Sequence, residues 1–87
     1  MAKNMRSVYI SLPSVSSVQK FVALVSKMEG NFDLRSGNYI LDARSLMGIF
    51  SLDLTKPIKL NVQNDTEETM LALKSFIVDD ADPRVGQ

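Results

Sequence analysis

The 87-residue chain has few side chains suited to catalysis, because it contains neither histidine nor cysteine. Without histidine it lacks the commonest metal ligand, the commonest general base near neutral pH and an imidazole that could carry a phosphoryl group. Without cysteine it has no thiolate nucleophile and no disulfide, and a domain without disulfides fits the cytoplasm. The chemistry that remains is that of hydroxyl and carboxylate groups.

The carboxylates do not form a pair or cluster along the chain. The aspartates considered for acid–base or metal chemistry fall in separate predicted turns: Asp33, Asp42, Asp53 and Asp65. We therefore expect no metal site, no cofactor and no enzymatic activity.

The charge balance argues against two classes of partner. Ten basic and ten acidic residues cancel, so no net field attracts nucleic acid or an anionic membrane. Tyr9 and Tyr39 lack the basic, aromatic-rich strand setting of RNA-binding sheets. No apolar run is long enough for a membrane helix, and the first residues lack the apolar core of a signal peptide. We expect a cytoplasmic protein that binds neither nucleic acid nor membrane.

Ser45 stands at the head of an unusually apolar stretch, "ARSLMGIFSLDL", residues 43–54. A serine before an apolar helical run is a good N-cap, and a helix start is also a favourable place for a phosphate group. The run is too dense for a plain amphipathic helix to bury all of it. Its apolar side chains therefore have two readings, as core residues or as an exposed binding surface.

Hydrophobic periodicity predicts the elements that hold these residues. They are a strand over 6–12 ended by Pro13, a helix over 14–29, a hairpin over 31–43 that turns at 36–38, a short helix from 45, a strand around 58–62, and a helix from Asp65 to about Val78. Ser14 or Ser16 is expected to cap the first helix, Gly30 to follow its C-terminus in a left-handed conformation, and Asp65 with Glu68 to cap the last helix.

This order predicts an α+β fold with βαββαβα connectivity: a four-stranded sheet with the helices on one face, in which the two strands of the hairpin are antiparallel. Residues 1–79 are expected to form a single domain, and residues 80–87 a flexible C-terminal tail.

Two stretches, "RSLMG" at 44–48 and "NDTEETMLALKSFI" at 64–77, together with this order, give the chain a family likeness. Over residues 6–78 it resembles HPr, the small phosphocarrier of the bacterial phosphoenolpyruvate-dependent sugar phosphotransferase system. The resemblance implies an open-faced β-sandwich fold, a four-stranded antiparallel sheet with three helices on one face. It also implies that Ser45 is the site of regulatory phosphorylation by a dedicated kinase, and that partner proteins bind at Arg44, Leu46, Met47 and Phe50 while Ile49 and Leu52 face the core.

The chain departs from the family at its active centre. The resemblance places Ser14 at the position of the family's phosphocarrier histidine, Ser16 at that of its arginine and Ser17 at that of its proline. A phosphohistidine transfers its phosphoryl group because its P–N bond is labile, whereas a serine phosphate is a stable ester. Asp53 also stands where the family usually has glycine. In losing the histidine and keeping the regulatory serine, the chain is similar to Crh, an HPr-like regulator.

The resemblance therefore implies a non-catalytic regulatory or protein-binding module. Its expected partners are proteins such as an HPr kinase/phosphorylase or a transcriptional regulator. The alternative is a sandwich that binds a small anion or a sugar phosphate at the N-terminus of the first helix, around Ser14 to Ser17.

Overall fold

The computed structural model describes residues 6–63 and 66–80. Their elements, in chain order, are β1 (Arg6–Ile10), α1 (Val15–Ser26), β2 (Phe32–Ser36), β3 (Tyr39–Asp42), α2 (Leu46–Phe50), β4 (Ile58–Val62), α3 (Glu67–Leu73) and β5 (Ile77–Asp80). The first seven follow the predicted βαββαβα order, so the α+β class is confirmed. The eighth element, a strand, was not predicted.

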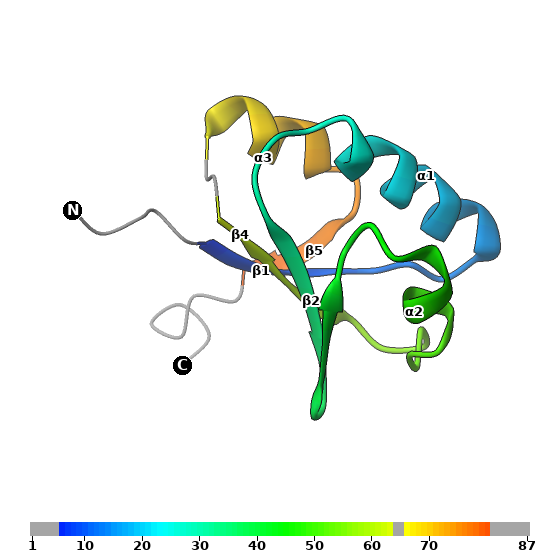
Figure 1. Cartoon of the computed structure of the whole chain (residues 1–87). Coiled ribbons are helices and arrows are strands. Elements are labelled where there is room, and N and C mark those ends of the chain that lie inside the picture. Colours follow the sequence, from blue (N-terminus) through cyan, green and yellow to red (C-terminus); the bar gives the residue numbers. More distant parts are fainter. Residues whose placement is uncertain (1–5, 64–65, 81–87) are drawn as a thin grey trace.

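The described strands form one antiparallel sheet in the order β3-β2-β4-β1-β5. The register places Leu34 of β2 opposite Leu60 of β4, and Leu60 opposite Val8 of β1. In β1, β2 and β4 the buried apolar residues occupy every second position, so their side chains point to the same face of the sheet. Helices α1 and α3 lie over that face (Figure 1).

The core lies between this face of the sheet and the helices. Helix α1 contributes Val18, Phe21 and Val25, spaced so that they share one side of the helix. The ring of Phe21 meets that of Phe76 edge to face, with the centroids 5.4 Å apart. No buried side-chain polar atom among the described residues lacks a hydrogen-bond partner.

The sheet has one strand more than predicted, and the prediction of four strands is wrong. The helix expected to reach Val78 ends at Leu73, and the N–H of Phe76 then donates to the Leu73 carbonyl at 2.9 Å. The Phe76 carbonyl accepts from the N–H of Ser11 at 2.9 Å, and Ile77–Asp80 continues as β5 along the free edge of β1. Asp80, assigned to the tail from the sequence, is thus the last residue of a strand.

The structure also differs from the predicted start of α3 and the predicted end of α1. Thr66 is the N-cap of α3, and its hydroxyl accepts from the N–H of Thr69 at 3.1 Å, whereas Asp65 of the predicted capping pair lies outside the described residues. Helix α1 ends earlier than expected, with Lys27 as its C-cap, so Gly30 does have a positive φ but lies three residues beyond the cap. The rest of the predicted tail, 81–87, also lies outside the described residues.

The hairpin prediction is confirmed. Ser36 pairs with Tyr39 across a two-residue loop, in which Gly37 adopts a φ of 61°. In the part of the chain that the structure describes, no helix is both long and apolar enough to span a bilayer.

Candidate functional site

The first candidate region is the start of α1, which the sequence resemblance aligns with the histidine of the HPr family. Ser14 is the N-cap, and its hydroxyl accepts from the N–H of Ser17 at 3.1 Å. In return, the Ser17 hydroxyl accepts from the N–H of Ser14 at 3.0 Å. This reciprocal pair is a capping box in which a serine takes the place of the usual glutamate. The structure thus selects Ser14 over Ser16 as the cap, and the side chain of Ser16 is exposed.

The second candidate region is α2, whose N-cap is Ser45. Its hydroxyl accepts from the N–H of Gly48 at 3.2 Å, and the residue is exposed. Gly48 leaves little room beside it, because a Cβ built there lies 2.8 Å from Ser45 Oγ. Ser45 therefore has the capping role that the sequence suggested, while its hydroxyl stays at the surface.

The apolar side chains of α2 divide into two groups. Ile49 is buried and Leu52, just after the helix, is 9% exposed, so the expectation that both face the core is confirmed. Met47 is 80% exposed and Phe50 is 37% exposed, whereas Leu46 is only partly exposed and packs against the core. Leu46 thus both helps to hold α2 against the core and contributes to the surface.

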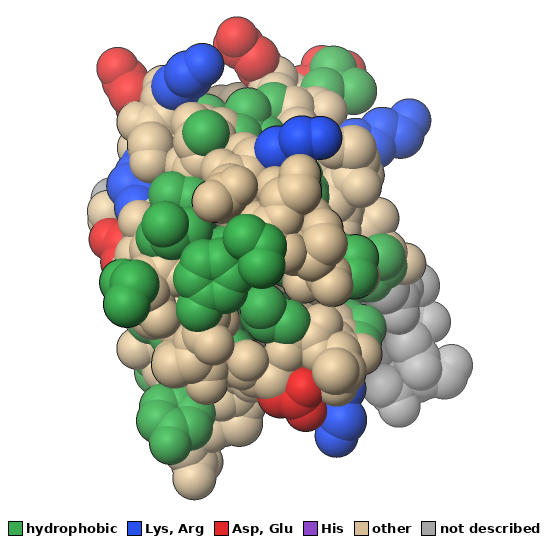
Figure 2. All heavy atoms as spheres, turned by 90° about the vertical axis from the view of Figure 1, so that its right-hand side faces the viewer, with side chains coloured by type: hydrophobic (Ala, Val, Ile, Leu, Met, Phe, Trp, Pro, Cys, Tyr) green, Lys and Arg blue, Asp and Glu red, His purple; other side chains and the backbone are tan. Residues whose placement is uncertain are grey.

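Helix α2 packs against α1, and Val15 in the first turn of α1 is exposed as well. Figure 2 shows hydrophobic side chains gathered on the side of the molecule that carries α2 and the start of α1. We call Val15, Met47 and Phe50, with the partly exposed Leu46, the α2 patch.

Arg44 has partners within the chain. One terminal nitrogen of its guanidinium donates to the carbonyls of Met28, at 2.7 Å, and Gly30, at 3.0 Å. The guanidinium carbon lies 5.4 Å from the centroid of the Phe32 ring, and Asp42 Oδ1 is 4.0 Å from its other terminal nitrogen. These contacts hold the loop after α1 against the loop before α2, so Arg44 has a structural role beside the candidate site.

Asp53 does not have the left-handed backbone conformation that would favour a glycine at this position. No described residue other than glycine has a positive φ. The Asp53 carboxylate accepts from the backbone N–H of Thr55 at 3.1 Å and from its hydroxyl at 2.5 Å. The hydroxyl bond first, then the backbone bond, lower the pKa of Asp53 from its ordinary value of 3.8. Within the described ranges, no three histidine, cysteine or acidic residues lie close enough to hold a metal ion.

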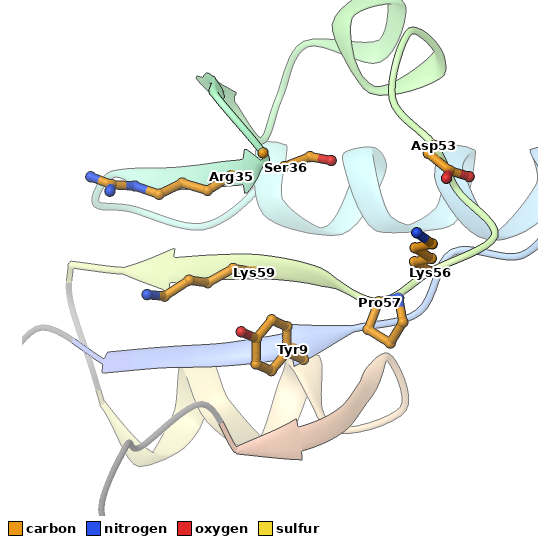
Figure 3. Close-up of a pocket in the computed structure, with 8 residues that line it drawn as sticks. Tyr9, Arg35, Ser36, Asp53, Lys56, Pro57 and Lys59 are labelled. Atoms are coloured by element: carbon orange, nitrogen blue, oxygen red, sulfur yellow. The ribbon is translucent and has the colours of Figure 1, made fainter. Parts of the chain in front are cut away.

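A further group of residues was missed from the sequence. On the sheet face that no described helix covers, a hollow of about 530 Å³ is lined by Tyr9, Arg35, Ser36, Gly37, Asp53, Lys56, Pro57 and Lys59 (Figure 3). Tyr9, Arg35 and Lys59 belong to three different strands, and only the strand register brings them into one row. The alternation of each strand predicts that they face solvent, but not that they are neighbours.

Comparison with models of known protein families gave no match, and no curated protein matched the sequence.

Proposed function

We propose that this chain is an HPr-like protein of the sugar phosphotransferase system family that cannot relay phosphate and instead binds partner proteins through the α2 patch. The observation that carries the proposal is the division of α2 into a buried anchor, Ile49, and exposed Met47 and Phe50. A five-residue helix that leaves a methionine and a phenylalanine in water loses burial energy, unless another surface covers them. Methionine also suits a binding surface, because its flexible side chain adapts to its partner.

The loss of phosphate relay rests on the chemistry at the start of α1. The family's histidine position holds Ser14, whose hydroxyl already caps the helix. A phosphate ester formed there would be stable, and Ser16 at the arginine position supplies no cation to hold it. The protein is thus proposed to be a regulator and not an enzyme, acting in the cytoplasm.

Phosphorylation of Ser45 is the proposed control of this surface. Its hydroxyl is at the surface, and its hydrogen bond to Gly48 N–H is one that a phosphate oxygen can replace. A doubly negative group there would lie two residues from Met47, and it would change what the α2 patch can bind. The proposed partner is an HPr kinase/phosphorylase or a transcriptional regulator.

The proposed phosphorylation of Ser45 is tested with an HPr kinase, ATP and three proteins: the natural chain, Ser45→Ala and Ser14→Ala. We expect labelling of the natural chain and of Ser14→Ala, and none of Ser45→Ala. Absence of labelling in all three, or equal labelling of Ser45→Ala, contradicts the proposal. Acid-labile phosphate acquired from the first enzyme of the phosphotransferase system and phosphoenolpyruvate would contradict the claim that the chain cannot relay.

The proposed binding of a partner protein to the α2 patch is tested with Phe50→Asp. Leu71→Asp is the matched control, because Leu71 is 63% exposed but lies on α3. With the kinase as the binding partner, we expect Phe50→Asp to weaken binding at least about tenfold and Leu71→Asp to leave it unchanged, with both circular dichroism spectra native. Equal affinities for the two variants would exclude the α2 patch as the docking surface.

A further inference from the structure

The hollow on the open face of the sheet holds cations in an arrangement that costs stability. Arg35 on β2 lies directly opposite Lys59 on β4. Like charges directly opposite each other on one sheet face repel, because their Cβ atoms are only about 5 Å apart. Lys56, three residues before Lys59, adds a third positive charge to the lining.

Within the described residues, no ion pair neutralises these three cations, and none of the three forms a side-chain hydrogen bond. The single carboxylate of the lining, Asp53, accepts two hydrogen bonds from Thr55 and interacts electrostatically with Lys56, so the lining has three cations and one anion. The hollow therefore has an excess of positive charge, suited to an anionic ligand.

Tyr9 gives the hollow an aromatic surface. It lies opposite Lys59 on the other side of β4, so the order across the sheet is Arg35, Lys59, Tyr9. Figure 3 looks onto this face: the Tyr9 ring is seen nearly face-on over β1, and the side chains of Arg35 and Lys59 run side by side along their strands. An exposed ring face beside cations is the arrangement on which a nucleobase stacks.

The neighbouring row along the strands limits the size of the ligand. It contains Asp33 opposite Asp42, and Asn61 opposite Asp33 on the other side, where Asn61 accepts a hydrogen bond from Ser7 at 2.6 Å. Two carboxylates next to the cationic row would repel a second phosphate group of a polynucleotide. The positive surface is thus wide enough for the phosphate group of one nucleotide.

From this geometry we propose that the hollow binds a mononucleotide, with its base on the ring of Tyr9 and its phosphate held by Arg35 and Lys59. The volume of about 530 Å³ falls within the range of small-ligand sites. The site lies on the sheet face opposite the helices, and the proposal is independent of that for the α2 patch.

The test is an NMR titration of the isotopically labelled full chain at low salt with AMP, adenosine, ribose 5-phosphate and a short oligothymidylate. We expect AMP to shift the amides around Tyr9, Arg35 and Lys59, with a Kd of about 1 mM or lower. Adenosine and ribose 5-phosphate should bind at least about tenfold more weakly, since each lacks one of the two recognised parts.

Three variants and one control assign the roles. Arg35→Gln and Lys59→Gln should each raise the Kd for AMP about tenfold. Tyr9→Leu should weaken the binding of AMP but not that of ribose 5-phosphate. Lys20→Gln removes one exposed charge from α1 and should change nothing.

Four results would overturn the proposal. The first two are the absence of amide shifts with AMP and amide shifts confined to residues 14–18. The other two are a loss of AMP affinity in Lys20→Gln equal to that in Arg35→Gln or Lys59→Gln, and tighter binding of the oligothymidylate than of AMP. The last would indicate a surface for single-stranded nucleic acid.

Discussion

Gly48 controls the start of α2, because a side chain at this position would collide with the N-cap. A Cβ at Gly48 would lie 2.8 Å from Ser45 Oγ and 3.5 Å from Leu41 Cδ1. The N-cap hydrogen bond and the absence of a side chain at Gly48 thus depend on each other.

We expect Ser45→Ala to lower the free energy of unfolding by about 1 kcal/mol, through loss of the cap. Gly48→Ala should change it little, because the loss of the cap is offset by the helix propensity of alanine. The double variant should be more stable than the sum of the two effects predicts, because the cap that the Gly48→Ala side chain disrupts is already absent in Ser45→Ala. Urea unfolding of all four proteins in a double-mutant cycle measures this coupling. Additive effects would show that Ser45 and Gly48 are not coupled in this way.

Asp53 should make the fold sensitive to acid. Its pKa is lower in the folded chain than in the unfolded chain, because the hydrogen bonds from Thr55 favour the ionised carboxylate. The stabilisation is therefore present above pH 3.8 and is lost as the pH falls through the folded-state pKa.

We expect Asp53→Asn to be less stable than the natural chain at pH 6, and the difference to shrink at pH 3. Urea unfolding at the two pH values measures it. Thr55→Val, which removes the hydroxyl donor, is the matched variant and should show a smaller change in the same direction. A difference that stays constant with pH would mean that Asp53 titrates alike in the folded and unfolded chains.

At the scale of elements, the segment after α3 was misassigned for a physical reason. Met70, Leu73, Phe76 and Ile77 recur at three and four residues, which is the period of a helix. A strand forms instead because the edge of β1 has unpaired backbone groups that the segment satisfies, beginning with the bond from Ser11 N–H to the Phe76 carbonyl. The sequence of the segment contains no sign of that edge.

Ile77 and Val78 test this strand as a matched pair. Ile77 packs against the core, whereas Val78 is 55% exposed. We expect Ile77→Ala to cost about 1–2 kcal/mol and Val78→Ala less than about 0.5 kcal/mol in urea unfolding. Two neutral substitutions would show that Ile77 does not pack against the core as part of this strand.

The sequence predicts those parts of the candidate site whose contacts join residues close together in the chain, and fails for contacts between distant segments. The Ser45 cap and the buried Ile49 follow from local spacing, because both depend on neighbours within one turn. The contacts of Arg44 with the Met28 and Gly30 carbonyls, and the row of Arg35, Lys59 and Tyr9, join segments far apart in the chain. Local periodicity predicts which side of a strand a residue faces, but not which strand lies beside it.

At the scale of the whole molecule, a net charge of zero conceals an uneven distribution. The uncovered sheet face has Arg35 and Lys59 in one row and Asp33 and Asp42 in the next. Without a bound anion, the cationic row is a source of repulsion that salt screens.

We expect Lys59→Gln to be more stable than Lys20→Gln by about 0.5 kcal/mol at low salt, and the difference to fall as the salt concentration rises. Urea unfolding of the ligand-free proteins at 10 mM and 500 mM sodium chloride gives both values. If Lys59→Gln were instead the less stable variant, most of all at low salt, a protein carboxylate would be neutralising Lys59.

The strand order also bears on how the chain folds as it is synthesised. Of the pairings in the described sheet, only that of β2 with β3 joins strands adjacent in sequence. Strand β1 is synthesised before the other described strands, whereas its neighbours β4 and β5 are synthesised after most of the domain. Its apolar residues Val8 and Ile10 therefore have no strand partner until then. The hairpin can form early, but the sheet closes only when the ribosome has released β4 and the segment after α3. In the nascent chain, the apolar residues of β1 therefore stay without their strand neighbours for longer than those of β2 and β3.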